Sequence, residues 1–174
     1  MRAPAPSSRT FLLLGSLALL AACSGKDIRR PGESLGFYAV TGTLQSSSCG
    51  EAPSPWAFRV ELRKETTPSA KLYWSQGDMP ISSPLAADGK ASFVAESSHV
   101  IRAATAKVAG CTVYRKDTVD LVLDATQSKF TGTLSYAYAA GDGSECEDLS
   151  AAGINTLPCS VGYALDATGG DAGK

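Results

Sequence analysis

Five cysteines are the residues of this sequence with the most definite chemistry, and one of them stands apart from the others. Cys23 follows directly on an apolar run and is itself followed by the small and charged residues SGKDIRR. The remaining four are spread over the rest of the chain: Cys49, Cys111, Cys146 and Cys159. A cysteine thiol can be acylated, oxidised to a disulfide or bound to a metal ion. The surroundings of each cysteine must decide between these three reactions.

The surroundings of Cys23 favour acylation. The first nine residues carry Arg2 and Arg9 and no acid, and they lead into the apolar run 10–20. That length is typical of a signal-peptide core and is too short for a transmembrane helix, which needs about 20 apolar residues. At its end, Leu20-Ala21-Ala22-Cys23 resembles the lipobox of bacterial lipoproteins.

This resemblance implies that the chain is cut before Cys23, that its thiol carries a diacylglyceryl group and that the new amino terminus is acylated. Stable membrane anchoring needs more than one acyl chain, which such a cysteine supplies. Ser24 follows the cysteine, and in the family's usual sorting rule the absence of aspartate there favours the outer membrane. The alternative is an ordinary secretory signal with Cys23 merely near its cleavage site.

The other four cysteines predict two disulfides, as is typical of an exported chain. Three pairings are possible, and we favour Cys146 with Cys159 and Cys49 with Cys111. The reason is that residues 145–158 look like one loop between two strands, whose ends can meet. Metal binding is the weaker alternative, since no two cysteines have a C-x-x-C spacing and His99 is the only histidine.

Nucleophile and metalloprotease motifs are missing from this sequence. It contains no G-x-S-x-G, S-x-x-K or H-E-x-x-H, so a histidine mechanism would have to use His99. That residue stands in Glu96-Ser-Ser-His99, but adjacent residues of a strand point to opposite faces, and we expect a surface histidine. No catalytic residue, cofactor or metal site is predicted.

Two acidic groups could suggest ion binding. The segment 142–148 gathers four carboxylates but lacks the spacing of an EF-hand loop, so we expect a solvated acidic loop. Asp117, Asp120 and Asp124 follow Arg115 and Lys116, and we expect this face to be exposed to solvent.

Trp56, Tyr73 and Trp74 are the residues most like a ligand platform, because aromatic faces stack on sugars and flat ligands. The competing interpretation places both tryptophans in the core. Trp56 belongs to the apolar face of an alternating segment, and Leu72 shares its face with Trp74. Tyr73 would then be the exposed ring.

The elements that must position these residues are strands. Segment 56–63 alternates, with Trp56, Phe58, Val60 and Leu62 on one face and Arg59, Glu61 and Arg63 on the other. Further strands are expected within residues 37–44, 71–75, 91–95, 111–114, 118–124, 130–138 and 159–166, whereas 99–108 fits a strand or a short helix. Gly132 indicates a bulge or a close approach. The pattern predicts an all-β domain, a single antiparallel β-sandwich or small β-barrel of about eight strands with two disulfides.

The predicted organisation is a signal peptide (1–22), a lipidated cysteine with a flexible tether (23–35), the β domain (36–166) and a disordered tail (167–174). Of 16 basic and 17 acidic residues, Arg2 and Arg9 lie in the segment to be removed. The rest is slightly acidic and has no basic field for nucleic acid.

We therefore expect an envelope lipoprotein, held in the membrane through Cys23, that acts as a non-catalytic binding or interaction module. Recognition is expected in the loops 46–55, 76–84 and 141–158, because loops on a rigid scaffold carry most binding sites. The partner would be an envelope protein or a small ligand. A purely structural role and a small-ligand-binding barrel are the alternatives, and an enzyme is the least favoured class. PWAFRVELR and LPCSVGYALDA resemble small β-rich lipoproteins of Gram-negative bacteria, a resemblance that implies no activity.

Overall fold

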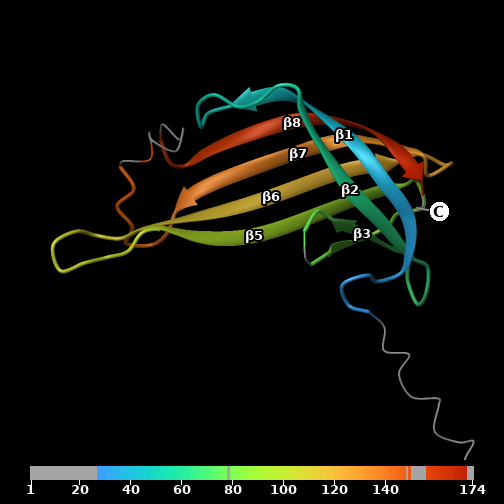
Figure 1. Ribbon diagram of the computed structural model, residues 1–174, viewed down its shortest axis with the longest axis horizontal. Helices are drawn as coiled ribbons and strands as arrows, with labels where there is room; N and C mark the ends of the chain where they lie inside the picture. The colour runs from blue at the N-terminus through green and yellow to red at the C-terminus, as the bar shows by residue number, and fades with distance from the viewer. Residues whose placement is uncertain (1–26, 78, 148, 150–155, 172–174) are drawn as a thin grey trace, which may run out of the picture.

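The computed structural model describes residues 27–77, 79–147, 149 and 156–171, and these residues form one antiparallel β-sheet (Figure 1). Its strands are β1 (Glu33–Ser47), β2 (Trp56–Glu65), β3 (Lys71–Ser75), β4 (Ile81–Pro84), β5 (Lys90–Arg102), β6 (Cys111–Leu123), β7 (Lys129–Ala140) and β8 (Cys159–Asp171). The predicted all-β antiparallel class is confirmed.

The sheet is an up-and-down meander that curls on itself into a nearly closed barrel. Its strand order is β4-β3-β2-β1-β8-β7-β6-β5, so the first strand pairs with the last, and β4 and β5 are the two edges. These edges meet where the Ser92 amide donates a hydrogen bond of 2.9 Å to Ser83 Oγ. Of the two predicted architectures, a β-sandwich and a small β-barrel, the structure therefore has the barrel-like one.

The inward face of the barrel is built by strict alternation. In β8 the inward residues are each at most 9% exposed, and they are Cys159, Val161, Tyr163, Leu165 and Ala167. An eight-stranded barrel is just wide enough for its own side chains or one small ligand. Most of the interior is filled with large apolar side chains, among them Tyr38, Leu62, Leu72, Phe93, Phe130 and Leu165.

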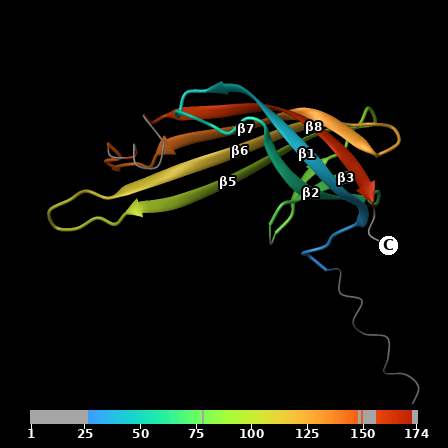
Figure 2. The ribbon, with the colours of Figure 1, turned by 45° about the horizontal axis from the view of Figure 1, so that its top comes forward.

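The two ends of the barrel differ. At the closed end, where β1 begins and β6 turns into β7, the Tyr38 hydroxyl donates a hydrogen bond to the Gln127 carbonyl. Burial, with the nearby charge of Asp124, raises the pKa of Tyr38 to about 12, so the hydroxyl stays a donor at neutral pH. At the other end, called the open end here, β5 and β6 project beyond the short strands β3 and β4 (Figure 2).

Two details of the strands differ from the expected pattern, and two others agree with it. Strand β4 falls inside the predicted loop 76–84, and β6 is one strand where the sequence predicted two short ones. Residues 99–102 continue β5, so the strand alternative for the start of 99–108 is the observed one. Gly132 marks a close approach, because a Cβ there would lie 2.1 Å from the Asp120 carbonyl oxygen.

Both predicted ends of the domain were set too far inward. The expected tether 23–35 overlaps β1, which already begins at Glu33, and the expected disordered tail from 167 continues β8 to Asp171. Residues 167–171 extend the strand because they pair with β1 and β7, as in Val40 opposite Ala167 and Lys129 opposite Thr168. Glycine-rich sequence alone did not reveal these partners.

A buried ion pair fixes the entry of the chain into the barrel. Glu61 and Arg63, expected on the solvent face of β2, are only 8% and 9% exposed. Arg63 Nη1 donates to Glu61 Oε1 at 2.6 Å, and its other nitrogens donate to the carbonyls of Pro31 at 3.0 Å and Gly32 at 2.8 Å. The segment before β1 therefore covers the outer face of β2, which corrects the prediction for these two residues.

Candidate functional site

The open end of the barrel holds two adjacent hollows of about 370 Å³ each. Both are bordered by Trp56, Arg115 and Tyr136. One extends towards Trp74 and the β3–β4 connection, and the other towards the β1–β2 connection and Tyr163. Strands β3 and β4 are much shorter than their neighbours β2 and β5, so this side of the barrel extends less far and the first hollow is open there. We call these two hollows together the mouth.

Arg115 and Asp117 supply the charged groups of the mouth. They lie on β6 between the inward-facing Val113 and Val119, so the alternation of the strand turns both side chains inward. Arg115 Nε and Nη2 each donate to one Asp117 carboxylate oxygen at 2.6 Å, a bidentate pair. The hydrogen bonds to Asp117 raise the pKa of Arg115 against the opposing effect of its burial. Their predicted place on a solvent-exposed face is therefore wrong.

The Arg115 guanidinium also stacks on an aromatic ring. Its central carbon lies 4.4 Å from the centroid of the Tyr136 ring, a cation–π distance. Burial raises the pKa of Tyr136 well above its ordinary value. The phenol therefore keeps its proton at neutral pH and can act as both hydrogen-bond donor and acceptor.

An aromatic cluster forms the wall of the mouth, with Trp56 at its centre. The Trp56 ring centroid lies 4.6 Å from Phe58, 5.4 Å from Tyr163 and 5.8 Å from Tyr136, all in tilted arrangements. Such offset contacts are favourable between aromatic rings. Trp56 is only partly buried, so the cluster holds its ring in place while part of it still faces the mouth.

The three aromatic residues predicted as a platform separate in the structure. Trp56 and Trp74 both border the first hollow, although Trp74 is 4% exposed and belongs mainly to the core. Tyr73 points to the other face of β3, where its hydroxyl donates to Glu65 Oε2 at 2.6 Å. Tyr73 is thus not part of the mouth. Arg115, Asp117, Tyr136 and Tyr163 are its members that sequence analysis missed, and their shared parity with Val119, Leu134 and Leu165 was the available signal.

Both disulfides lie at the open end, but their pairing corrects the prediction. The bonds are Cys49–Cys159 and Cys111–Cys146, not Cys49–Cys111 and Cys146–Cys159. Cys49 meets Cys159 because the end of β1 pairs with the start of β8, as the bond from the Ser48 amide to the Ser160 carbonyl at 2.8 Å shows. Cys49 itself borders the second hollow, so this bond fixes the rim of the mouth.

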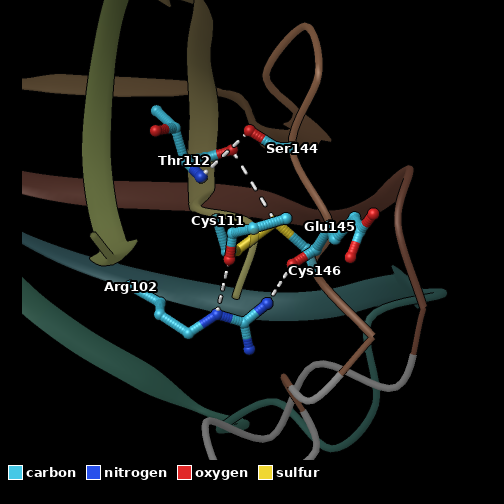
Figure 3. The surroundings of a disulfide bond; sticks show 7 residues. Arg102, Cys111, Thr112, Ser144, Glu145 and Cys146 are labelled. Carbon is cyan, nitrogen blue, oxygen red and sulfur yellow. Dashed lines mark hydrogen bonds between the residues drawn. A yellow bond between two sulfur atoms is a disulfide. The ribbon is translucent and has the colours of Figure 1, made fainter. Parts of the chain in front are cut away.

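The second disulfide ties the chain after β7 to the start of β6 (Figure 3). Around it, the Thr112 amide donates to Ser144 Oγ at 3.1 Å. Arg102 at the end of β5 donates to the carbonyls of Ala109 at 3.0 Å and Glu145 at 2.6 Å. The β5–β6 connection, which was not among the predicted recognition loops, is thereby joined to the β7–β8 connection, which was.

The other candidates from the sequence do not border the mouth. His99 is exposed near the end of β5, and Glu96 makes an ion pair of 3.6 Å with Lys116. Within the described ranges, no three His, Cys, Asp or Glu side chains come together as a metal site would require. Among the same residues there is no helix with the length and apolar character needed to cross a bilayer. Cys23 and residues 1–22 lie outside the described residues.

Comparison with known proteins identifies no relative of this chain. The chain matches no protein family, no curated protein and no solved structure.

Proposed function

We propose that this protein is a lipid-anchored envelope protein that binds a small ligand, without catalysis, in the mouth of its barrel. The observation that carries the proposal is the mouth itself, where a half-buried tryptophan and a stacked arginine border both hollows. Binding sites are typically concave and mostly apolar, with a few placed polar groups. The interior below is packed, so the ligand would be held at the mouth and not at the centre of the barrel.

The proposed anchor fits the orientation of the barrel. The chain enters the sheet at the closed end, and Arg63 holds Pro31 and Gly32 there. Residues 24–30 would connect a lipid on Cys23 to this end, a reach of at most about 25 Å. The mouth would then face away from the membrane, where it is accessible to a ligand.

Lipidation is expected to occur on Cys23 alone. Mass spectrometry of the mature amino terminus should find an acylated Cys23, and Cys23→Ala should move the protein from the membrane fraction to the soluble or unprocessed fraction. The expected loss is nearly complete, because without its acyl chains the protein has no anchor. An unmodified mature chain that begins at another residue would refute the anchor and leave the binding proposal standing.

Ligand binding is expected to depend on Trp56. A library of small fragments screened by ligand-observed NMR against the purified protein should give hits that Trp56→Ala weakens at least tenfold, since this large aromatic ring is only partly buried and borders both hollows. Tyr73→Phe is the matched control, because Tyr73 lies on the other face of the sheet. Hits that bind wild-type protein and Trp56→Ala equally would place the binding elsewhere.

A protein partner is the second candidate, and one observation favours it. Val100, Ile101 and Val108, at the projecting end of β5 and in the connection to β6, are 69%, 55% and 47% exposed. All three fall within residues 100–108, and groups of exposed apolar side chains commonly mark interaction surfaces. Replacing all three by serine should abolish capture of such a partner and leave small-ligand binding unchanged.

A further inference from the structure

The charges of the mouth cancel and leave a slight acidic excess. Arg115 and Asp117 neutralise each other through two hydrogen bonds, with 34% and 26% of their side chains exposed. Glu51 adds a carboxylate at the border of the second hollow. No other Lys, Arg, Asp or Glu borders either hollow in the part of the chain that the structure describes.

This arrangement disfavours a charged ligand of either sign. An anion would meet Asp117 and Glu51, while Arg115 already directs two N–H groups to Asp117. A cation would seek an aromatic face, but the Arg115 guanidinium lies 4.4 Å from the Tyr136 centroid. Trp56 is next to Tyr136, with centroids 5.8 Å apart, so a cation on Trp56 would lie close to the like charge of Arg115. The mouth therefore fits a neutral ligand better than an ionic one.

The mouth nevertheless offers many hydrogen-bonding groups. An arginine has five N–H groups, and the hydrogen bonds of Arg115 to other described residues use two of them. Burial raises the pKa values of Tyr136 and Tyr163, so both phenols remain donors as well as acceptors. A flat hydrocarbon would leave these groups unpaired on binding, which costs free energy.

We propose that the ligand is a neutral sugar ring, an inference that rests on the proposed binding function of the mouth. The C–H face of a sugar is apolar and can stack on Trp56, because the face of an aromatic ring carries partial negative charge. The ring hydroxyls both donate and accept, so they can pair with Arg115, Asp117 and the two phenols. The size of each hollow, about 370 Å³, fits one or two sugar units.

The test compares neutral and charged sugars on the purified protein. Cellobiose, maltose and N,N′-diacetylchitobiose are titrated by calorimetry and saturation-transfer NMR beside glucuronate, glucosamine and the flat aromatic compound indole. At least one neutral disaccharide is expected to bind tenfold or more tightly than either charged sugar. Trp56→Ala should abolish that binding, Trp56→Phe should weaken it severalfold, and Tyr73→Phe should leave it unchanged.

The role of the charged pair is tested with the same neutral disaccharide. Arg115→Lys should weaken its binding at least fivefold, since a lysine cannot make the bidentate bond that orients Asp117. Binding of charged sugars as tightly as neutral ones would overturn the proposal. If indole binds at the mouth and no neutral sugar does, the sugar proposal fails and the binding function stands. If none of these compounds binds the folded protein, the sugar proposal fails, and the binding function fails with it only when the fragment screen also gives no hit that depends on Trp56.

Discussion

Replacing Cys49 and Cys159 together by serine is expected to lower the free energy of unfolding by about 5 kcal/mol, the largest effect foreseen for this protein. The bond joins residues 110 positions apart, and loop-closure entropy in the unfolded chain grows with the length of the closed loop. The matched double variant, Cys111→Ser with Cys146→Ser, removes a disulfide between residues only 35 positions apart. Its loss should cost about 4 kcal/mol by the same entropy relation.

Urea unfolding of the two double variants measures both effects. Non-reducing peptide mapping of wild-type protein should recover Cys49 joined to Cys159. The Cys49 and Cys159 variant should also bind mouth ligands more weakly, because Cys49 borders the second hollow. Recovery of a Cys49–Cys111 peptide, or a larger loss of stability in the Cys111 and Cys146 variant, would contradict the prediction.

Replacing Arg63 by methionine is expected to cost about 3 kcal/mol of stability or more, because it leaves the Glu61 carboxylate buried without its main partner. The side chains of Glu61 and Arg63 are both 11% exposed. Arg30, at 3.5 Å from Glu61, is mostly exposed and should compensate only in part. Thermal and urea unfolding of Arg63→Met measures the loss.

The double variant Glu61→Leu with Arg63→Met is the control for the buried charge. It should be more stable than Arg63→Met alone by about 1 to 2 kcal/mol, because no charge remains unpaired. It should not reach wild-type stability, since the carbonyls of Pro31 and Gly32 still lose their donor. A double variant less stable than the single one would show that Glu61 is not the source of the cost.

The same pair predicts a dependence of stability on pH. Burial acts to raise the pKa of Glu61, but hydrogen bonds from Arg63 and Ser34 and the charges of Arg63 and Arg30 outweigh it and lower this pKa below 4.5. A carboxylate whose pKa is lower in the folded state contributes stability above its unfolded pKa, and this contribution is lost as pH falls through the folded pKa. Between about pH 5 and pH 3, Glu61→Gln should therefore lose less stability than wild-type protein.

The strand class could be predicted from sequence because it depends on local alternation. Segments such as Trp56–Leu62 and Cys159–Leu165 place apolar side chains at every second position, and this pattern has only one periodic structure that fits it. The three predicted recognition loops follow β1, β3 and β7, so the meander brings all of them to the open end. The members of the mouth were harder to predict. The type of Trp56 is enough to suggest it, whereas the cluster of charged residues around Arg115 and Asp117 predicted a solvent-exposed face.

What the sequence by itself determined is the period of each strand, the number of cysteines available for disulfides and the lack of known catalytic motifs. Only the tertiary structure decided which ends meet. The pairing of β1 with β8 brings Cys49 to Cys159 across 110 residues, and no local pattern encodes a contact at that separation. In the same way, alternation states that Arg115 and Val119 share a face, but only the curling of the sheet shows that this face is the inside of a barrel. The physical reason is that alternation is a property of neighbouring residues, whereas strand pairing and closure depend on the packing of the whole inner face.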